Sequence, residues 1–551
     1  MAQNKPIGEL LKEAGFVNEE QIQVALSVQK ANPVFLGEIL QDLDFVTSSE
    51  IAEAIAMQNG LEYIDLSTVI PMQEALRLVP YEVAKSKNIL PLRVEDDILI
   101  VAMQDINDII TIDYLRKITQ KTVKFVVADR VSIAKYVEIY YYQMSNPIET
   151  EIAEIIKQSL ENKEVDIPHL VDLILNNAIK DKATDVHITP ERSAIHVFYR
   201  IDGVLKHYFS LPTKLHAQIV ARIKIICNLD ISETRKPQDG SFSHSFLNED
   251  FDLRVSTLPT NYGENIVLRL LGKETSIFSL SRLGMTEANS KKIQSYFSKP
   301  YGIVLIVGPT GSGKTTTLYS ALRKVNSLEK NVVTIEDPIE YKFTFIKQTQ
   351  LHEKSGYTFD VAIRAFMRQD PDVMLVGEIR DQQTAELAVR ASITGHLVLS
   401  TMHTNDAIGA IPRLIDLNIP PYLIASGLLG VIAQRLVRKL CNYCKKEVQM
   451  SEQELQDAGI PQGIIEKYPN YTICEPVGCE YCKKTGYSGR EAVVEILDVD
   501  KEIESLITQE VSSLELLKVA KSKGMHTLKE DGYIKVLRGI TSFAEVNRVI
   551  N

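Results

Sequence analysis

The chain has 551 residues, of which 45% are hydrophobic and 24% are charged, as is ordinary for a globular protein of about three to four domains. Its formal net charge of −11 weighs against a basic nucleic-acid-binding face, and no run of apolar residues is long enough to span a bilayer. The amino-terminal residues lack the apolar core of a secretory signal. We therefore expect a cytoplasmic protein.

The first 60 residues contain an internal repeat. The sequence Ile-Gly-Glu-Leu-Leu at Ile7–Leu11 is answered by Leu-Gly-Glu-Ile-Leu at Leu36–Leu40. Apolar residues recur at helical spacing in each copy, and Asn18 or Thr47 stands where the N-cap of a helix is expected. We predict two helical hairpins over residues 1–60, each too small to bury its apolar face alone.

Residues 61–142 read as a small α/β unit, which completes an amino-terminal domain of residues 1–142. Ile98–Ala102 and Val123–Val127 are predicted strands, because each is a short run of mostly apolar, β-branched residues. The next stretch, 143–165, is polar and acidic. We predict that it is a linker.

Residues 166–284 are predicted to form a second α/β unit, with strands at Ala194–Gly203, Asp252–Thr257 and Asn265–Leu270. Beyond them, apolar strands alternate with helical patterns, which is typical of a mostly parallel sheet that is buried on both faces. We assign this third domain to residues 285–505.

A phosphate-binding loop follows the apolar strand Ile303–Val307 and precedes a predicted helix at Thr316–Val325. The loop reads Gly-Pro-Thr-Gly-Ser-Gly-Lys-Thr and fits the pattern G-x-x-x-x-G-K-[ST] at every fixed position. Its glycines let several backbone N–H groups face one phosphate, its lysine reaches the β- and γ-phosphates, and its last threonine places a hydroxyl on Mg²⁺. The lysine is also a candidate catalytic residue. The predicted ATP-binding residues are Gly308, Pro309, Thr310, Gly311, Ser312, Gly313, Lys314, Thr315 and Thr316.

Two strand ends carry the acids that ATP hydrolysis needs. The apolar strand that begins at Val373 ends in Glu378, but the Asp usual in such a strand is replaced by Gly377. A second acid, Glu336, follows the strand Val332–Ile335. We expect Glu378 to bind Mg²⁺ together with the loop threonine, and either Glu378 or Glu336 to orient the attacking water.

His396 and His403 bracket another apolar strand of the same domain. The end of a parallel strand delivers side chains to the ligand crevice, so either histidine could contact the γ-phosphate or donate a hydrogen bond to a neighbour. Both are candidate catalytic residues. The alternative is that they are structural.

Clustered cysteines follow and form two Cys-x-x-Cys pairs in sequence that favours turns. Four thiolates at this spacing suit a tetrahedral structural Zn²⁺ and leave no open position for catalysis. We therefore predict a zinc-binding insertion at residues 441–482, with a helical segment at 506–551 closing the chain. The predicted zinc ligands are Cys441, Cys444, Cys479 and Cys482.

Four motifs in a fixed order make the chain resemble the secretion and type IV pilus ATPases, the GspE/PilB family. They are the phosphate loop Gly308–Thr315, the Asp box Thr334–Glu340, the Walker B region Arg368–Asp381 and the His box Thr394–Asn405. The resemblance extends over about residues 1–505. The two cysteine pairs are typical of the assembly branch of this family and are generally absent from the pilus-retraction branch.

The resemblance implies an α/β multidomain protein. A RecA-like P-loop NTPase domain would follow a PAS-like α/β domain and a mobile amino-terminal domain, and it would carry the small zinc-binding subdomain. The family forms hexameric rings in which ATP lies between the last two domains, so a homo-hexamer is implied here. Arginines of the PAS-like domain would reach the phosphates as the domains close, and each could instead form a structural ion pair. The matching positions are Arg200, Arg222, Arg254 and Arg269.

The first 60 residues also resemble a nucleotide-sensing module of some family members, which binds cyclic di-GMP through two repeats that begin Arg-Leu-Gly. Here Pro6 and Phe35 stand in place of the arginine, and Asp44 replaces the glycine that Gly15 provides in the first copy. Without the arginine, the bidentate contact to guanine is lost. The sequence therefore favours a protein-docking module over a cyclic di-GMP site, and both stay open.

These observations predict a cytoplasmic motor, peripheral at the inner face of the cell membrane, that hydrolyses ATP to power type IV pilus assembly. Its implied partners are an inner-membrane platform protein and a cytoplasmic assembly-ring protein. A type II secretion ATPase is the first alternative, because the motor is the same and only the cargo differs. A DNA-uptake motor is disfavoured by the acidic charge. A nucleotide switch without turnover is disfavoured by the paired acids.

Overall fold

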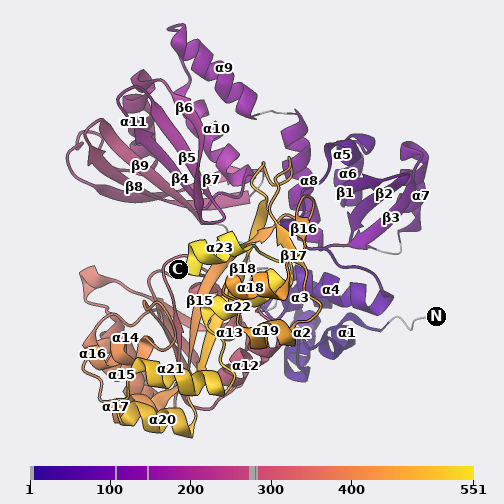
Figure 1. The fold of residues 1–551 in the computed structure, drawn as a ribbon. Coiled ribbons are helices and arrows are strands. Elements are labelled where there is room, and N and C mark those ends of the chain that lie inside the picture. The colour runs from indigo at the N-terminus through magenta and orange to yellow at the C-terminus, as the bar shows by residue number, and fades with distance from the viewer. Residues whose placement is uncertain are drawn as a thin grey trace. The chain divides into compact units, whose positions relative to one another are not determined.

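The structure is a computed structural model, and the chain divides into two units. One unit contains Met1–Ala14 and Ser48–Glu274, and the other contains Gly15–Thr47 and Thr275–Asn551. Figure 1 colours both along the chain. Asn146 and Pro147 of the expected linker, and residues 272–279 and 281–282 of the expected middle domain, lie outside the described residues. The described residues are 5–105, 108–145, 148–247, 249–271, 280 and 283–550.

The amino-terminal repeat forms four short helices, as its periodicity predicts, but these helices pair mainly between the two copies and not as one hairpin within each copy. Asn18 caps the second of them with a capping box, in which its side chain and that of Gln21 each accept the other's backbone N–H. Helix α1 packs on α4 in the first unit, and α2 packs on α3 in the second. The helices are α1 (Ile7–Glu13), α2 (Glu19–Ala31), α3 (Leu36–Asp42) and α4 (Ser48–Asn59).

A three-stranded sheet with helices on it follows in the first unit. Its strands β2 (Ile98–Met103) and β3 (Thr122–Val127) confirm the two predicted ones. The sequence analysis missed β1 (Ile89–Glu95), which pairs antiparallel with β2 and whose register shifts after Pro91, a residue that cannot donate to a ladder. The other elements are η1 (Leu66–Thr68), α5 (Gln73–Leu78), α6 (Tyr81–Lys87), α7 (Ile109–Thr119) and α8 (Arg130–Ser145).

The stretch expected to be a polar linker, 143–165, contains a helix, α9 (Ile148–Leu160). Its Ile148, Ile152 and Ile155 are buried, because spacings of three and four residues place them on one face of the helix. That face packs on α10 (Ile167–Lys180). The acidic residues that suggested a linker occupy the remaining, solvent-facing positions.

The middle of the chain forms a six-stranded antiparallel sheet of order β6-β5-β4-β9-β8-β7 (Figure 1). The three predicted strands are present as β5, β8 and β9. Helices α10 and α11 pack on each other and on β4 and β9, and this contact encloses the apolar core of the domain. The elements are β4 (Asp185–Pro190), β5 (Ile195–Ile201), β6 (Val204–Leu211), η2 (Thr213–Leu215), α11 (His216–Ile226), β7 (Gln238–Phe246), β8 (Glu249–Thr260) and β9 (Gly263–Leu271).

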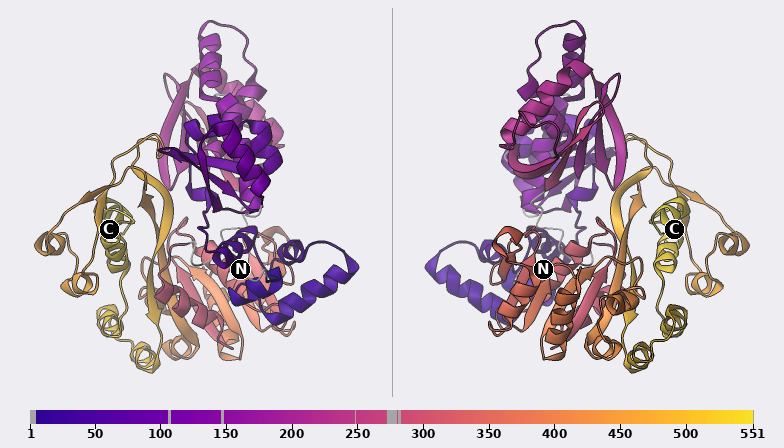
Figure 2. Two further views of the ribbon diagram at one scale, coloured as in Figure 1. Left: turned by 90° about the vertical axis from the view of Figure 1, so that its right-hand side faces the viewer. Right: turned by 90° about the vertical axis from the view of Figure 1, so that its left-hand side faces the viewer.

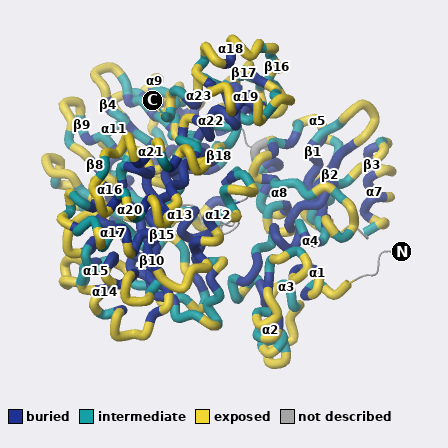
Figure 3. Tube along the Cα trace, turned by 60° about the horizontal axis from the view of Figure 1, so that its bottom comes forward, coloured by how far each residue is buried: buried dark blue, intermediate teal, exposed yellow. Residues whose placement is uncertain are grey.

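The second unit is built on a seven-stranded sheet of order β12-β11-β13-β14-β10-β15-β18. All neighbouring strands are parallel except β15 and β18. Every residue of β10, β13 and β14 is buried, which is why these strands are mostly apolar. Figure 3 colours the whole trace by burial. The strands are β10 (Gly302–Val307), β11 (Val332–Glu336), β12 (Lys347–Gln350), β13 (Val373–Val376), β14 (Leu397–Met402), β15 (Leu428–Leu440) and β18 (Tyr487–Asp498).

Apolar cores lie on both faces of this sheet, which Figure 2 shows from two further sides. Alternate residues of β10 enter one core or the other, as the period of a strand requires. The helices of this part are α12 (Glu287–Phe297), α13 (Lys314–Lys324), η4 (Glu353–Ser355), α14 (Phe359–Phe366), α15 (Gln382–Ile393), α16 (Ala410–Asp416) and α17 (Pro421–Gly427).

The remaining elements are a small insertion and the helical tail. The insertion holds the two-stranded sheet β16–β17, and the tail helices α22 and α23 pack on β15 and the neighbouring β18. Within the described ranges, no helix is both long and apolar enough to cross a membrane. The elements are β16 (Lys446–Val448), α18 (Glu452–Asp457), α19 (Gln462–Lys467), β17 (Ile473–Glu475), α20 (Lys501–Thr508), α21 (Ser513–Ser522), α22 (Leu528–Leu537) and α23 (Phe543–Ile550).

Candidate nucleotide site and cysteine cluster

The phosphate loop joins the end of β10 to the start of α13, as its sequence predicts. Gly308 and Gly313 have φ values of +149° and +86°, in the range that favours glycine. A Cβ on Gly308 would lie 2.6 Å from the backbone oxygen of Gln434, and one on Gly313 would lie 2.7 Å from its Nε2. The loop is therefore closely backed by β15, and both glycines are needed for that fit.

Lys314 opens α13 and folds back over the loop. Its Nζ donates to the backbone oxygens of Gly308 at 2.7 Å and Pro309 at 3.0 Å. Burial lowers the pKa of Lys314 to about 8, the charge of Glu378 opposes this shift, and the charge of Arg435 adds to it. The pKa of the Lys314 ammonium therefore depends on the charges of Glu378 and Arg435 as well as on burial.

Glu378 lies just beyond β13, at the same edge of the sheet as the phosphate loop. Only 13% of its side chain is exposed. It forms an ion pair with Arg380, and its Oε2 lies 3.6 Å from Nε2 of His403, which follows the carboxyl end of β14. Because β13 and β14 are neighbours, their carboxyl ends bring this acid and this histidine together.

The structure places His396 at the opposite end of the sheet. His396 precedes Leu397, which pairs with Gly302 at the start of β10, whereas the phosphate loop follows the end of β10 at Val307. Its Nδ1 lies 3.0 Å from the backbone oxygen of Ala391. The expectation that either histidine could reach the ligand crevice is therefore corrected: a parallel strand has one carboxyl end, and only His403 is there.

Glu336 is the last residue of β11 and is 4% exposed. Its carboxylate accepts hydrogen bonds from the Thr334 hydroxyl at 2.6 Å, from Nε2 of Gln348 at 3.1 Å and from the Tyr319 hydroxyl. This acid is therefore held by three donors inside the fold, unlike Glu378, which faces a histidine and an arginine beside the loop.

The sequence analysis missed two residues of β15 that lie against the phosphate loop. Gln434 donates from Nε2 to the backbone oxygen of Ser312 at 2.8 Å and accepts from the Thr317 hydroxyl at 2.7 Å. Arg435 donates from Nη2 to the backbone oxygen of Asn405 at 2.9 Å, and burial lowers its pKa. The available signal was a Gln-Arg pair that directly follows the apolar run Val431–Ala433.

Three of the predicted arginines line up across the antiparallel sheet of the first unit. Asp185 pairs in register with Arg200 on one side and Arg269 on the other, and Arg269 pairs with Arg254. Asp185 lies 3.0 Å from Nε of Arg269 and 3.5 Å from Nε of Arg200. Three arginines thus share a row with one aspartate.

The fourth arginine, Arg222, is on α11, and its Nε is buried without a hydrogen-bond partner in the part of the chain that the structure describes. All four arginines belong to the first unit and the phosphate loop belongs to the second. Their delivery to the phosphates stays a prediction.

The four predicted zinc ligands lie together, with their Sγ atoms within 4.8 Å of one another. The Sγ–Sγ distances are 3.9 Å for Cys441 and Cys479, 3.8 Å for Cys444 and Cys482, and 3.8 Å for Cys479 and Cys482. A tetrahedral zinc ion with Zn–S bonds of about 2.3 Å separates its ligands by about 3.8 Å. The residues therefore fit a structural Zn²⁺.

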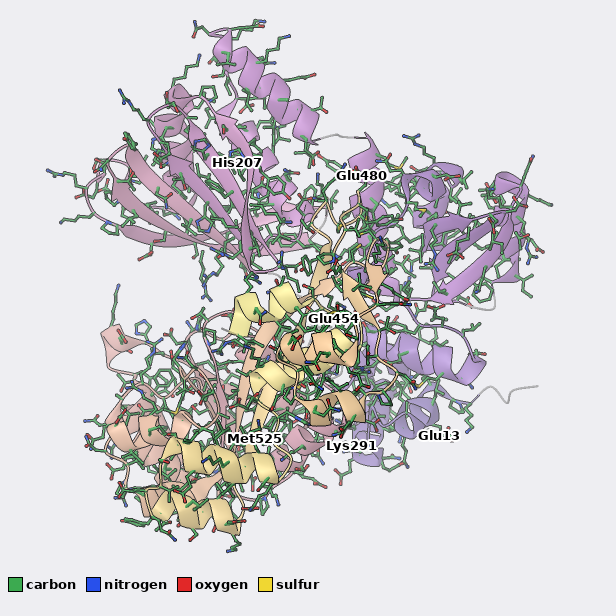
Figure 4. The ribbon with its side chains drawn as sticks, in the orientation of Figure 1. Glu13, His207, Lys291, Glu454, Glu480 and Met525 are labelled. Atoms are coloured by element: carbon green, nitrogen blue, oxygen red, sulfur yellow. The ribbon has the colours of Figure 1, made fainter. Side chains whose placement is uncertain are left out.

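The backbone around the cluster also suits thiolates. The N–H groups of Cys479 and Gly486 each lie 3.1 Å from Sγ of Cys482. Burial raises the pKa of this thiol, but these N–H donors, together with hydrogen bonds to the Cys444 and Cys479 thiols, outweigh it and bring the pKa to about 7. The turn that holds the second pair carries Glu480, which Figure 4 labels.

Comparisons with known proteins place the chain. The family model of the Type II/IV secretion system protein matches residues 160–548. The chain belongs to this family. The MshEN domain model matches residues 59–165, so it falls on the α/β part of the amino-terminal region and not on the helical repeat where a cyclic di-GMP site was considered.

Two relatives and one solved structure illustrate the match. The "Type IV pilus assembly ATPase PilB" of Myxococcus xanthus (strain DK1622) is 38% identical in an alignment of 556 positions that covers 98% of each chain. The "Type II secretion system protein E" of Dickeya dadantii (strain 3937) is 46% identical over 383 residues, which are 70% of this chain and 75% of the relative.

The solved structure of the Legionella pneumophila ATPase DotB aligns with a TM-score of 0.51 and 21% identity over 69% of this chain and 95% of that one, so it supports the fold alone. Together with the phosphate loop, the family identifies the chain as a P-loop ATPase of the GspE/PilB type. The resemblance seen in the four motifs is thereby confirmed.

Proposed function

We propose that this chain is the motor ATPase of a type IV pilus assembly machine. The observation that carries the proposal is the full-length likeness to the Myxococcus xanthus relative, which includes the amino-terminal region and the tail. The type II secretion relative matches only 70% of the chain, although at higher identity. The proposal thus goes beyond ATPase activity to the machine that the ATPase drives, and the identity of that machine needs a separate test.

The proposed cycle begins with ATP in the phosphate loop. Lys314 would leave its carbonyl partners for the β- and γ-phosphates, and Thr315 and Glu378 would hold Mg²⁺, which would neutralise phosphate charge. His403 and Arg380 orient the Glu378 carboxylate from either side. Because Gly377 stands where such a strand usually carries an Asp, binding of the metal would fall to Glu378.

We assign the attacking water to Glu336, on condition that its bonds to Thr334, Gln348 and Tyr319 rearrange. Glu378 is the alternative if it can hold the metal and the water at once. Arg435 adds a guanidinium from the same chain, and the row of Arg200, Arg254 and Arg269, together with Arg222, would complete the charge on closure of the domains.

The partners in this proposal are further copies of the chain in a hexameric ring, an inner-membrane platform protein and a cytoplasmic assembly-ring protein. The chain would act at the inner face of the membrane without crossing it and without direct contact to nucleic acid. Zn²⁺ would hold the two cysteine pairs together. Cyclic di-GMP remains the less favoured ligand of residues 1–60.

The cargo is tested in the source organism by deleting the gene and restoring it as wild type or as Lys314→Ala. We expect surface pili, counted by electron microscopy, to be lost on deletion and restored by the wild type alone. Loss of secreted proteins with pili intact would contradict the pilus assignment and would favour the type II secretion alternative. The higher sequence identity of the chain to the Dickeya relative supports that alternative.

A further inference from the structure

Asp44 lies in the turn between α3 and α4, where the first copy of the repeat has Gly15. Both backbones are left-handed, with φ of +58° at Asp44 and +75° at Gly15. Asp is among the few side chains that tolerate this conformation, so the second copy keeps the turn and gains a carboxylate. A glycine would be sufficient for the turn, so the turn does not explain why the second copy has a carboxylate at this position.

That carboxylate binds the loop that joins β11 to β12, residues 337–346. It accepts hydrogen bonds from the Tyr341 hydroxyl at 2.6 Å, the Thr344 N–H at 2.9 Å and the Thr344 hydroxyl at 2.8 Å. Burial and the bond to Asp44 raise the pKa of Tyr341, so its hydroxyl stays protonated and donates. Hydrogen bonds to an ionised acceptor are the stronger kind, which makes this contact specific.

Two further contacts join the same surfaces. The rings of Phe45 and Phe345 stack with their centroids 6.0 Å apart. Phe345 has a φ of +66°, a conformation that an aromatic residue adopts only when its surroundings hold it there. Nδ2 of Asn326 donates to Glu20 on α2 at 3.0 Å. Residues 15–47 therefore contact the ATPase domain at more than one point.

The bound loop is linked to Glu336 by packed side chains. Gln348 donates from Nε2 both to the backbone oxygen of Tyr341 at 2.9 Å and to Glu336 at 3.1 Å. The ring of Tyr341 meets Phe343 at 4.9 Å, and Phe343 meets Tyr319 at 5.3 Å. Tyr319 in turn donates to Glu336. Both routes run from the Asp44 contact to the proposed base.

Residues 15–47 belong to the unit that holds the ATPase domain, whereas the segments on either side of them, 1–14 and 48–274, belong to the other unit. We propose that residues 15–47 are a docking element that binds the loop 337–346 through Asp44 and thereby slows ATP turnover until it is displaced. The docked contact keeps Glu336 bonded to Gln348 and Tyr319.

We assign the partner of the loop 337–346 to this chain's own repeat, because Asp44, the residue that replaces the glycine of the first copy, supplies the contact. The inference rests on the ATPase and not on its cargo, so it stands or falls separately from the pilus assignment. Displacement would come from a partner or ligand that binds residues 15–47 more tightly than the loop does.

The test uses the full-length protein and the variant Asp44→Asn, which keeps a side chain that tolerates the left-handed turn but loses the charge and presents an amide to two donors. In Asp44→Asn, the fraction of molecules in which residues 15–47 are detached from the loop 337–346 should rise by about tenfold or more. Hydrogen exchange of the Thr344 amide, which Asp44 binds directly, should quicken, and ATP turnover should rise severalfold. Asp42→Asn removes the same charge from an exposed position two residues away and should change neither quantity.

A second variant, Tyr341→Phe, keeps the ring on Phe343 and removes only the hydroxyl that binds Asp44. It should raise turnover in the same direction, and the double variant with Asp44→Asn should exceed the stronger single variant by little. Unchanged exchange at Thr344 in Asp44→Asn, or quicker exchange without faster turnover, would overturn the proposal. Protection of Thr344 that grows with protein concentration would overturn the contact within one chain and indicate one between copies.

Discussion

The phosphate loop and the cysteine cluster lie in one domain and both come from short local motifs, but their side chains are held differently. Lys314 lies on backbone carbonyls that a phosphate can replace, and Glu378 lies beside a histidine and an arginine. In the cluster, by contrast, three Sγ–Sγ distances already match the edges of a zinc tetrahedron. One site is arranged to exchange partners, and the other to keep them.

This difference predicts that the two sites fail in different ways. A change in the phosphate loop should remove turnover and leave the fold, because the loop's catalytic side chain is not part of a core. A change in the cluster should remove the fold of the insertion first and turnover only as a consequence.

The largest effect on turnover is expected for Lys314→Ala. Loss of the ammonium should reduce ATP turnover by about a hundredfold or more, because Lys314 is the one cationic side chain between Gly308 and Thr315. The unfolding temperature should stay within a few degrees of the wild type, since Lys314 bonds only polar backbone atoms in the contacts above. Phosphate release and thermal unfolding measure the two quantities, and normal turnover would refute the assigned role.

The largest effect on stability is expected for Cys444→Ser. Removing one of four ligands should release Zn²⁺ and lower the unfolding temperature by roughly 10 °C or more. Cys474→Ser is the control, because Cys474 is a buried cysteine of the same insertion that lies outside the set of four. Metal content by elemental analysis should fall only in the first variant. Equal metal content in both would argue against a zinc site.

The sequence predicts the parts of both sites that are contiguous. The phosphate loop and the two cysteine pairs need only local spacing, so their residues are found before any fold is known. Gln434 and Arg435 could not be found that way, because they reach the loop only through the pairing of β15 with β10. Helix α9 was missed because its acidic face concealed three isoleucines at helical spacing.

Arg435 is a charged residue beside the phosphate loop that belongs to no sequence motif, so its substitution tests whether the nucleotide site extends beyond the motifs. Arg435→Gln should lower kcat by about tenfold to a hundredfold, since it removes a guanidinium beside the phosphates. It should also move the alkaline limb of kcat/KM to higher pH. In the wild type we expect this limb to reflect loss of the Lys314 proton, whose pKa burial lowers to about 8 with a further lowering by the positive charge of Arg435. An unmoved limb would exclude this coupling.

The smallest effect is expected from the two histidines, and it tests how far position along one strand decides function. His403→Gln should lower turnover by about tenfold, because Nε2 lies 3.6 Å from Glu378 and orients the acid that holds Mg²⁺. His396→Gln should leave turnover within twofold or so, since that ring lies at the amino end of β14 against Ala391. If His403 acts through the metal acid, raising Mg²⁺ should restore part of the lost rate in His403→Gln. Equal losses in the two variants, without any response to Mg²⁺, would show that the strand as a whole and not its carboxyl end carries the effect.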